Sequence, residues 1–167
     1  MKVYLIGMPG CGKSTLGKKL AEKLNYQFID MDNYIEMNAC MYIDEIFEAY
    51  GEKFFRALET NTLKEFSDLD NVVIATGGGV IKNKNHKELM NGICIYLETS
   101  IGNIKNRLEE SSIERPLLKE KTVEQLYNER KDLYDYFADI KVDNANIDLA
   151  IKSIVKHLEV DNEGISN

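Results

Sequence analysis

The sequence is poor in cysteine and lacks any long apolar segment, and each shortage excludes a class of protein. It has only three cysteines, Cys11, Cys40 and Cys94, and no Cys-x-x-Cys pair, so neither a disulfide framework nor a zinc site is indicated. No apolar run reaches the roughly 18 residues of a membrane-spanning helix. The first residues also show no basic segment followed by an apolar one, as a secretion signal would. We therefore expect a cytoplasmic protein.

Positive charge is also scarce in this chain. Its 21 lysines and arginines face 28 aspartates and glutamates, and the formal net charge is −7. Such a balance disfavours nonspecific binding to nucleic acid or to anionic lipid. It does not disfavour ATP, which needs only a local positive pocket. We expect a monomer whose partners are small molecules, with no nucleic-acid or membrane partner.

The 167 residues suit one domain, because no internal repeat, low-complexity tract or linker-like stretch divides them. Short apolar, strand-like runs alternate with helical patterns. The runs are 3–6, 27–29, 72–75, 93–97 and 140–142, and the helical patterns are 13–24, 32–38, 43–49, 52–66, 84–90, 100–109, 123–137 and 146–159. This alternation predicts an α/β fold in which helices cover both faces of a parallel sheet. We expect one domain over residues 1–160, followed by a disordered polar tail at 161–167.

The most informative motif runs from Gly7 to Thr15 and reads Gly-Met-Pro-Gly-Cys-Gly-Lys-Ser-Thr. It fits the phosphate-binding pattern G-x-x-x-x-G-K-[ST]. Its glycines let successive backbone N–H groups point into one concavity, which leads into a helix N-terminus that favours phosphate. Lys13 can reach the outer phosphates, and the Ser14 hydroxyl can bind Mg²⁺. A strand-like run precedes the motif and a helical pattern follows it, so we prefer nucleotide binding to a glycine turn that binds nothing.

Two carboxylates, Asp30 and Asp32, follow the second strand-like run. With one residue between them at a strand end, these two side chains can reach the same cleft. Beside a phosphate loop they suit Mg²⁺, which needs carboxylate or water oxygens. The alternative is that Asp32 only caps the helix that follows.

Further along the chain, Arg56 lies four residues after Glu52 and three before Glu59, a spacing that also fits a solvated surface ion pair. The third strand-like run ends in Gly77, Gly78 and Gly79. Three consecutive glycines indicate a place where the backbone approaches a ligand, although a flexible turn is the simpler alternative.

Two further arginines stand in unusual surroundings. Arg115 closes a polar stretch between two helical patterns, as in a lid over a transferring phosphate, or in an ordinary loop. Arg130 lies in an apolar helical stripe, where it either reaches the surface along its stem or meets a buried anion. The two histidines, His86 and His157, have no catalytic pattern around them, and we interpret both as surface residues.

Together these motifs resemble the shikimate kinase family over nearly the whole chain, from Met1 to about Leu158. The resemblance implies a three-layer α/β sandwich of the P-loop, nucleoside-monophosphate-kinase-like type, with a five-stranded parallel sheet. It also implies a substrate-binding region at about residues 32–60 and a mobile lid at about 109–119. The implied reaction is the transfer of the γ-phosphate of ATP to the 3-hydroxyl of shikimate, with Mg²⁺ as cofactor.

The resemblance also implies a role for each matching residue. Lys13, Asp32 and Arg115 would be catalytic, with Asp32 contacting the attacking hydroxyl. Ser14 would ligate Mg²⁺ directly and Asp30 through water. The implied nucleotide-binding residues are Gly10, Cys11, Gly12, Lys13, Ser14, Thr15, Arg107 and Arg115. The implied shikimate-binding residues are Asp32, Arg56, Gly77, Gly78, Gly79 and Arg130.

The sequence departs from the family pattern in three places. Ala57 replaces a second arginine, no proline stands between Arg130 and Tyr134, and the segment near Asn144 matches the adenine-contacting segment poorly. The competing interpretations are another small-molecule or nucleotide kinase of the same fold, and a nucleotide-binding domain that transfers no phosphate. The first would not need Arg56, the glycines and Arg130 together. The second would be expected to lose Lys13, an aspartate or Arg115.

Overall fold

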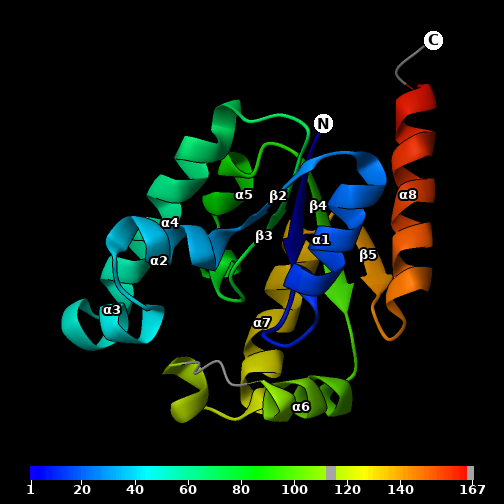
Figure 1. Cartoon of the computed structure of the whole chain (residues 1–167). Helices are drawn as coiled ribbons and strands as arrows, with labels where there is room; N and C mark the ends of the chain where they lie inside the picture. Colours follow the sequence, from blue (N-terminus) through cyan, green and yellow to red (C-terminus); the bar gives the residue numbers. More distant parts are fainter. Residues whose placement is uncertain (112–115, 165–167) are drawn as a thin grey trace.

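A five-stranded parallel sheet forms the centre of this computed structural model, which describes residues 1–111 and 116–164 (Figure 1). Its strands are β1 (Lys2–Ile6), β2 (Gln27–Asp30), β3 (Val72–Ala75), β4 (Ile93–Glu98) and β5 (Ile140–Asp143). They lie in the order β2-β3-β1-β4-β5. In the central strand, Val3 pairs with Val73 on one side and with Ile93 on the other. All five predicted runs form strands, so the α/β prediction is confirmed.

Helices cover both faces of the sheet, with α1 and α8 packed together on one face and α7 on the other (Figure 1). The helices are α1 (Lys13–Leu24), α2 (Met31–Ala39), α3 (Ile43–Tyr50), α4 (Glu52–Glu65), α5 (His86–Leu89), α6 (Ile101–Glu110), α7 (Val123–Phe137) and α8 (Ile147–Gly164). Short 3-10 turns are η1 (Phe66–Asp68), η2 (Val80–Lys82) and η3 (Pro116–Lys119). The smaller helices α2 and α3 extend away from the sheet with α4 behind them (Figure 1).

Two predicted helices differ from the structure by more than one residue at an end. The pattern at 84–90 forms only the single turn α5, because the Asn83 side chain accepts a hydrogen bond from the Asn85 N–H and so competes with helical bonding. Helix α8 continues to Gly164, into the segment expected to be a tail. In the described part of the chain, no helix combines the length and apolar character needed to cross a bilayer.

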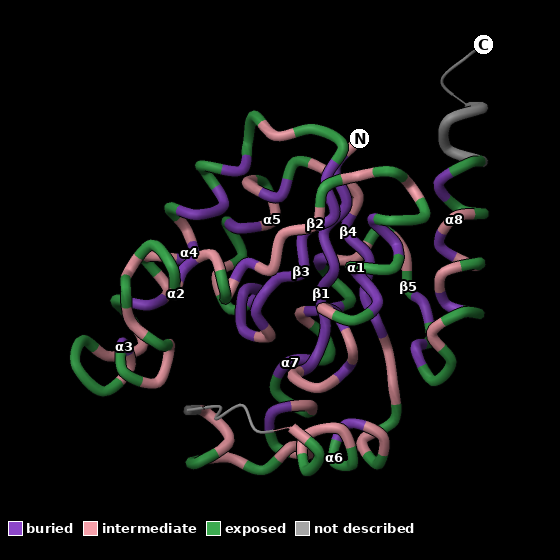
Figure 2. The backbone as a smooth tube through the Cα atoms, in the orientation of Figure 1, coloured by how far each residue is buried: buried purple, intermediate pink, exposed green. Residues whose placement is uncertain are grey.

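The core lies on both faces of the sheet, and β1 is buried along its whole length (Figure 2). Such two-sided burial explains why β1, β3 and β4 are mostly continuous apolar runs and not alternating ones. Because all five strands are parallel, their carboxyl ends meet at one edge of the sheet. The loop after β1, Asp30 at the end of β2 and the glycines after β3 therefore lie close together, where α/β proteins bind their ligands.

Candidate active site

A cavity of about 1050 Å³ opens over the carboxyl ends of β1, β2 and β3. It is lined by residues of the loop after β1, the start of α2, α4, the glycine turn, α6 and α7. Of the residues nominated from the sequence, all line this cavity except Cys11, which is fully buried, and Arg115, which lies outside the described residues. The fold therefore brings together side chains that are more than 100 positions apart in the sequence, such as Lys13 and Arg130.

The loop from Gly7 to Thr15 forms a tight turn between β1 and α1. Gly10 and Gly12 have φ angles of 79° and 95°, which only glycine adopts without strain. The Lys13 ammonium donates to the carbonyls of Gly7 at 2.7 Å and Met8 at 3.0 Å. Its third contact is the Cys11 thiol at 3.6 Å, a weak partner whose place a phosphate oxygen can take.

The backbone of this loop also accepts hydrogen bonds from side chains of α6 and of the segment directly after β5. The Cys11 carbonyl accepts hydrogen bonds from Arg107 Nη1 at 2.9 Å and from Asn144 Nδ2 at 2.8 Å. Arg107 Nη2 donates to the Asn144 carbonyl at 2.8 Å. Asn144 is 2% exposed, and its Oδ1 has no partner in the described part of the chain. Sequence reasoning assigned Asn144 no role, although its position directly after β5, at the carboxyl edge of the sheet, was a usable signal.

Ser14, at the start of α1, and Asp30, at the end of β2, bring two side-chain oxygens next to each other. The Ser14 hydroxyl donates to Asp30 Oδ2 at 2.5 Å. The other oxygen, Oδ1, accepts from the Asn33 N–H at 3.2 Å and so caps α2. The structure corrects the alternative that Asp32 is the cap, because Asp30 takes that position. Asp32 lies in the first turn of α2 and lines the cavity.

Each glycine of the turn after β3 lies against one polar side chain of the site. A Cβ atom added at Gly77 would lie 2.7 Å from Asp32 Oδ1, and one added at Gly78 would lie 3.3 Å from Arg130 Nη1. At Gly79 it would lie 2.7 Å from Arg56 Cζ. None of the three has a positive φ, so these positions need glycine for space and not for backbone conformation. The turn thus brings Asp32, Arg56 and Arg130 to one small volume.

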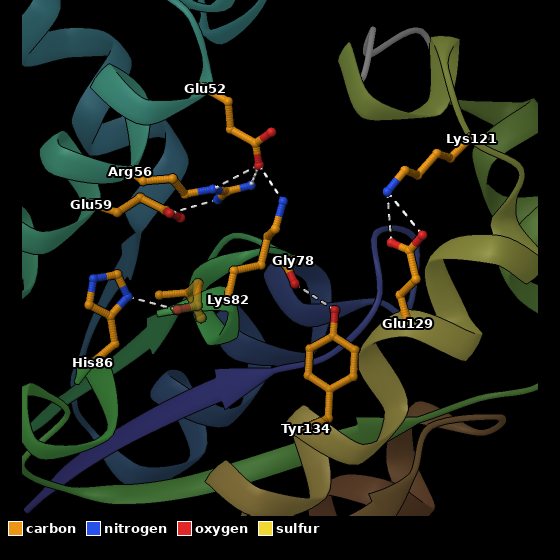
Figure 3. A network of polar contacts seen from close by, with 10 residues as sticks. Glu52, Arg56, Glu59, Gly78, Lys82, His86, Lys121, Glu129 and Tyr134 are labelled. Atoms are coloured by element: carbon orange, nitrogen blue, oxygen red, sulfur yellow. Dashed lines mark hydrogen bonds and ion pairs between the residues drawn. The ribbon is translucent and has the colours of Figure 1, made fainter. Parts of the chain in front are cut away.

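Arg56 is held by two glutamates that differ in their surroundings (Figure 3). Its Nη1 lies 2.6 Å from Glu59 Oε1, and its Nη2 lies 3.3 Å from Glu52 Oε1. Glu59 is 0% exposed, so the pair is not the solvated surface pair that the spacing also allowed. Burial raises the pKa of the Glu59 carboxyl, and the charge of Arg56 opposes that shift only in part. Glu59 is a buried polar member of the site that sequence reasoning treated only as a surface partner.

Arg130 enters the cavity from α7 and is 3% exposed. Among the described residues no carboxylate forms an ion pair with it. Tyr134, one helical turn further along α7, donates its hydroxyl hydrogen to the Gly78 carbonyl at 2.5 Å (Figure 3). Burying a cation is costly unless an anion accompanies it. The arrangement therefore favours an anionic ligand next to Arg130.

The two histidines differ. His157 is exposed, as expected, whereas His86 is fully buried and hydrogen-bonded through both ring nitrogens. The surface interpretation of His86 was therefore wrong.

The lid predicted at 109–119 includes residues 112–115, which the structure does not describe. Its last part, η3, packs against α3 and places Leu117 and Leu118 at the cavity.

Comparisons with known proteins point to one family. A sequence profile described as shikimate kinase matches residues 9–159. A shikimate kinase of Clostridium botulinum (strain Alaska E43 / Type E3) is 44% identical over 160 residues, which are 93% of this chain and 95% of the relative. One from Macrococcus caseolyticus is 42% identical and covers 86% of this chain and 88% of its own.

Solved structures agree. The shikimate kinase of Acinetobacter baumannii in complex with shikimate has a TM-score of 0.86 at 35% identity, over 95% of this chain and 93% of its own. The shikimate kinase of Aquifex aeolicus has a TM-score of 0.82 at 37% identity, over 97% and 98%. Since sequence, fold and cavity agree over nearly its full length, the chain belongs to the shikimate kinase family, whose members are ATP-dependent kinases that act on shikimate.

Proposed function

We propose that this protein transfers the γ-phosphate of ATP to the 3-hydroxyl of shikimate, giving shikimate 3-phosphate and ADP. The observation that carries the proposal is the buried Arg130 guanidinium, which has no carboxylate partner among the described residues and lies with Arg56 around a turn of three glycines. Shikimate is a small carboxylate with several hydroxyl groups. Two guanidinium groups suit its carboxylate, and Asp32 on the other side of the turn suits its hydroxyls.

The nucleotide end of the cavity is assigned to the loop after β1. Its backbone N–H groups and Lys13 would bind the phosphates of ATP, with Gly10, Gly12, Ser14 and Thr15 around them. Cys11 would contribute through its backbone, because its side chain is buried. Arg107 would act at the same end, where it already contacts the loop.

The residues at the end of β2 fit a magnesium ion. Ser14 Oγ and Asp30 Oδ2 are hard oxygen ligands that already lie next to each other, and Asp30 is held by its capping bond to α2. We assign direct ligation to Ser14 and ligation through water to Asp30. When bound, Mg²⁺ neutralises charge on the phosphate oxygens.

Catalysis by this chain would consist mainly of positioning and charge neutralisation, since phosphoryl transfer passes through a loose transition state. Lys13 and Arg115 of the lid would neutralise the transferring group. Arg56 and Arg130 would hold the carboxylate so that the 3-hydroxyl points at the phosphate. Asp32 would accept the proton or the hydrogen bond of that hydroxyl.

We extend the proposal to the organisation of the molecule. Residues 1–160 would be one domain with a substrate-binding region at about 32–60 and a lid at about 109–119. The enzyme would act as a cytoplasmic monomer without nucleic-acid or membrane partners. Analytical ultracentrifugation of the full chain tests the monomer, since a dimer would sediment as a species of twice the mass.

A coupled assay of ADP release tests the reaction. With ATP and Mg²⁺ we expect turnover of shikimate and none of gluconate or AMP at equal concentrations. Shikimate methyl ester should be a far poorer substrate, because loss of the charge-assisted contacts to Arg56 and Arg130 costs roughly 2–5 kcal/mol. Turnover of gluconate or AMP at the rate of shikimate would overturn the proposed reaction. Equal turnover of acid and ester would overturn the carboxylate assignment alone.

A further inference from the structure

His86 forms a buried bridge between two segments of the shikimate pocket. Its Nδ1 lies 2.7 Å from the carbonyl of Val80, the residue directly after Gly79. Its Nε2 lies 2.7 Å from the hydroxyl of Thr60, which is one helical turn after Arg56 on α4. None of its surface is exposed. Figure 3 shows the ring beside α4 and next to Arg56 and Glu59.

The partners of the ring fix the hydrogen on one of its nitrogens. A carbonyl oxygen only accepts, so Nδ1 of His86 must carry a hydrogen toward Val80. Nε2 lies within hydrogen-bond distance of the Thr60 hydroxyl, which can act as donor or as acceptor to the ring. That hydroxyl also lies 3.1 Å from the Arg56 carbonyl and can donate to it, because a carbonyl oxygen has two lone pairs. Thr60 therefore joins the ring to α4 close to Arg56.

The bridge lies behind the wall of the cavity and joins α4 to the segment after the glycines. Glu52, Arg56 and Thr60 are spaced four residues apart and lie on one face of α4, opposite the segment that follows the glycines. The same two segments are also joined by an ion pair between Glu52 and Lys82. That pair is more than one-third exposed on both sides and so contributes little. The buried contacts of His86 are the stronger connection.

We propose that His86 is a positioning residue for shikimate binding: its ring ties the glycine turn to α4 and thereby holds Arg56 at its distance from Gly79. The inference rests on the proposed function, in which Arg56 binds the shikimate carboxylate. Since Gly79 lies against the Arg56 guanidinium with no room for a Cβ, a small displacement of either segment changes the anion site. The nucleotide end lies on other elements and should be unaffected.

The first test removes the Thr60 hydroxyl at nearly constant volume. Thr60→Val should raise the KM for shikimate about 5- to 30-fold, as expected for loss of one buried hydrogen bond, and should change kcat and the KM for ATP less than about 2-fold. Thr60→Ser keeps the hydroxyl and should stay within about 2-fold of the wild type. His157→Gln, at the exposed histidine, is the matched control and should change nothing.

The second test asks whether Thr60 and His86 act together. His86→Asn keeps a donor for Val80 but removes the contact with Thr60, so the double variant with Thr60→Val should have a KM for shikimate no higher than the larger single change. A multiplicative increase would overturn the proposal, as would a KM for ATP that rises in parallel with that for shikimate. Thermal unfolding of each variant shows that it is folded under assay conditions.

Nitrogen-15 NMR of the wild-type ring provides a readout that is independent of turnover. We expect a protonated Nδ1 for His86, and an Nε2 shift that changes in Thr60→Val but not in His157→Gln. An Nε2 shift that is the same in the wild type and in Thr60→Val would overturn the proposal. If the wild type does not phosphorylate shikimate, the proposed function fails, whereas a normal wild type with an unchanged Thr60→Val variant defeats only the role of His86.

Discussion

Glu59 and Arg130 show at the scale of single residues how this pocket differs from an ordinary protein core. One is a buried carboxylate and the other a buried guanidinium, and they interact electrostatically without forming a direct ion pair. Glu59 uses one oxygen on Arg56, while its Oε2 lies beside Gly77 without a hydrogen-bond partner in the described part of the chain. Such incompletely paired groups cost stability, so we expect function and stability to respond differently when they are changed.

Glu59→Gln tests this expectation. Burial raises the pKa of the Glu59 carboxyl above its ordinary value of 4.5. Below that value the side chain is protonated in the folded and unfolded chain alike. As pH rises, the Glu59 carboxyl ionises first in the unfolded chain. The free energy of unfolding of the wild type therefore falls relative to that of the Gln variant, until the pH has passed the pKa of this carboxyl in the folded chain. The free energy of unfolding of the variant minus that of the wild type should therefore increase with pH, as measured by urea unfolding from pH 4 to 8.

The same variant should bind shikimate less well. Gln has no charge to hold the Arg56 guanidinium, and a charge-assisted hydrogen bond contributes about 1.5–3 kcal/mol, so the KM for shikimate should rise about tenfold or more. Glu129→Gln, which removes an exposed partner of Lys121, is the control and should alter neither quantity measurably. A stability difference that is independent of pH would contradict the pKa direction of Glu59.

Gly79→Ala is a second prediction at this scale. The new Cβ would overlap the Arg56 guanidinium, and such overpacking costs about 1–3 kcal/mol. We expect the KM for shikimate to rise about tenfold or more and the KM for ATP to stay within about 2-fold. Gly102→Ala is the matched control, because its Cβ would meet only Ser100 Oγ at 3.9 Å. A Gly79→Ala enzyme with normal shikimate kinetics would show that Arg56 does not depend on this contact.

At the scale of elements, the junction of β2 and α2 separates two carboxylates that have a single residue between them in the sequence. Asp30 ends the strand, caps the helix and contacts Ser14. Asp32 lies inside the first turn of the helix, on the side of the glycine turn. The change from strand to helix at this point gives the two side chains different neighbours. We therefore expect them to have different roles.

Asparagine at each position tests this division. Asn is as good an N-cap as Asp, so Asp30→Asn should fold normally, require more Mg²⁺ and be partly rescued by excess metal. Asp32→Asn should leave the Mg²⁺ titration unchanged, raise the KM for shikimate and lower kcat, by up to ~10²–10⁴-fold if Asp32 is a general base. The measurement is kcat and both KM values across a magnesium series. The same metal dependence in both variants would refute the division.

At the scale of the whole molecule, an acidic chain encloses a cavity with several cationic side chains. The formal net charge is −7, yet Lys13, Arg56, Arg107 and Arg130 all line the cavity. Positive charge is thus concentrated locally at the cavity. These cations come from α1, α4, α6 and α7, so an anionic ligand bound by them would connect elements that are far apart in the chain.

Thermal unfolding with ligands tests this connection. Saturation with shikimate at 100 times its Kd should stabilise the fold by about 2.7 kcal/mol, which for a chain of this size raises Tm by roughly 5–10 °C. Shikimate methyl ester at the same concentration should raise it far less. One cooperative transition that shifts as a whole is expected of a single domain, and two transitions, only one of which moves, would contradict the domain assignment.

Local patterns in the sequence were sufficient for the strands, most helices and the phosphate loop. These features depend on neighbouring residues: apolar runs form buried strands, and glycines with a following Lys-Ser form the loop at a helix N-terminus. The helix bounds were less accurate at α5, where an asparagine side chain competes with the backbone, and at the end of α8, which continues to Gly164.

The surroundings of the polar side chains were decided only by the tertiary structure. From the spacing alone Glu59 was a surface partner of Arg56 and His86 a surface residue, yet both are buried. Asn144 reaches the carbonyl of Cys11, 133 positions away. Burial and such contacts depend on which elements the sheet order brings together, which no local pattern contains. The sequence by itself therefore determined the elements and the phosphate loop, whereas packing decided which charges are buried at the pocket.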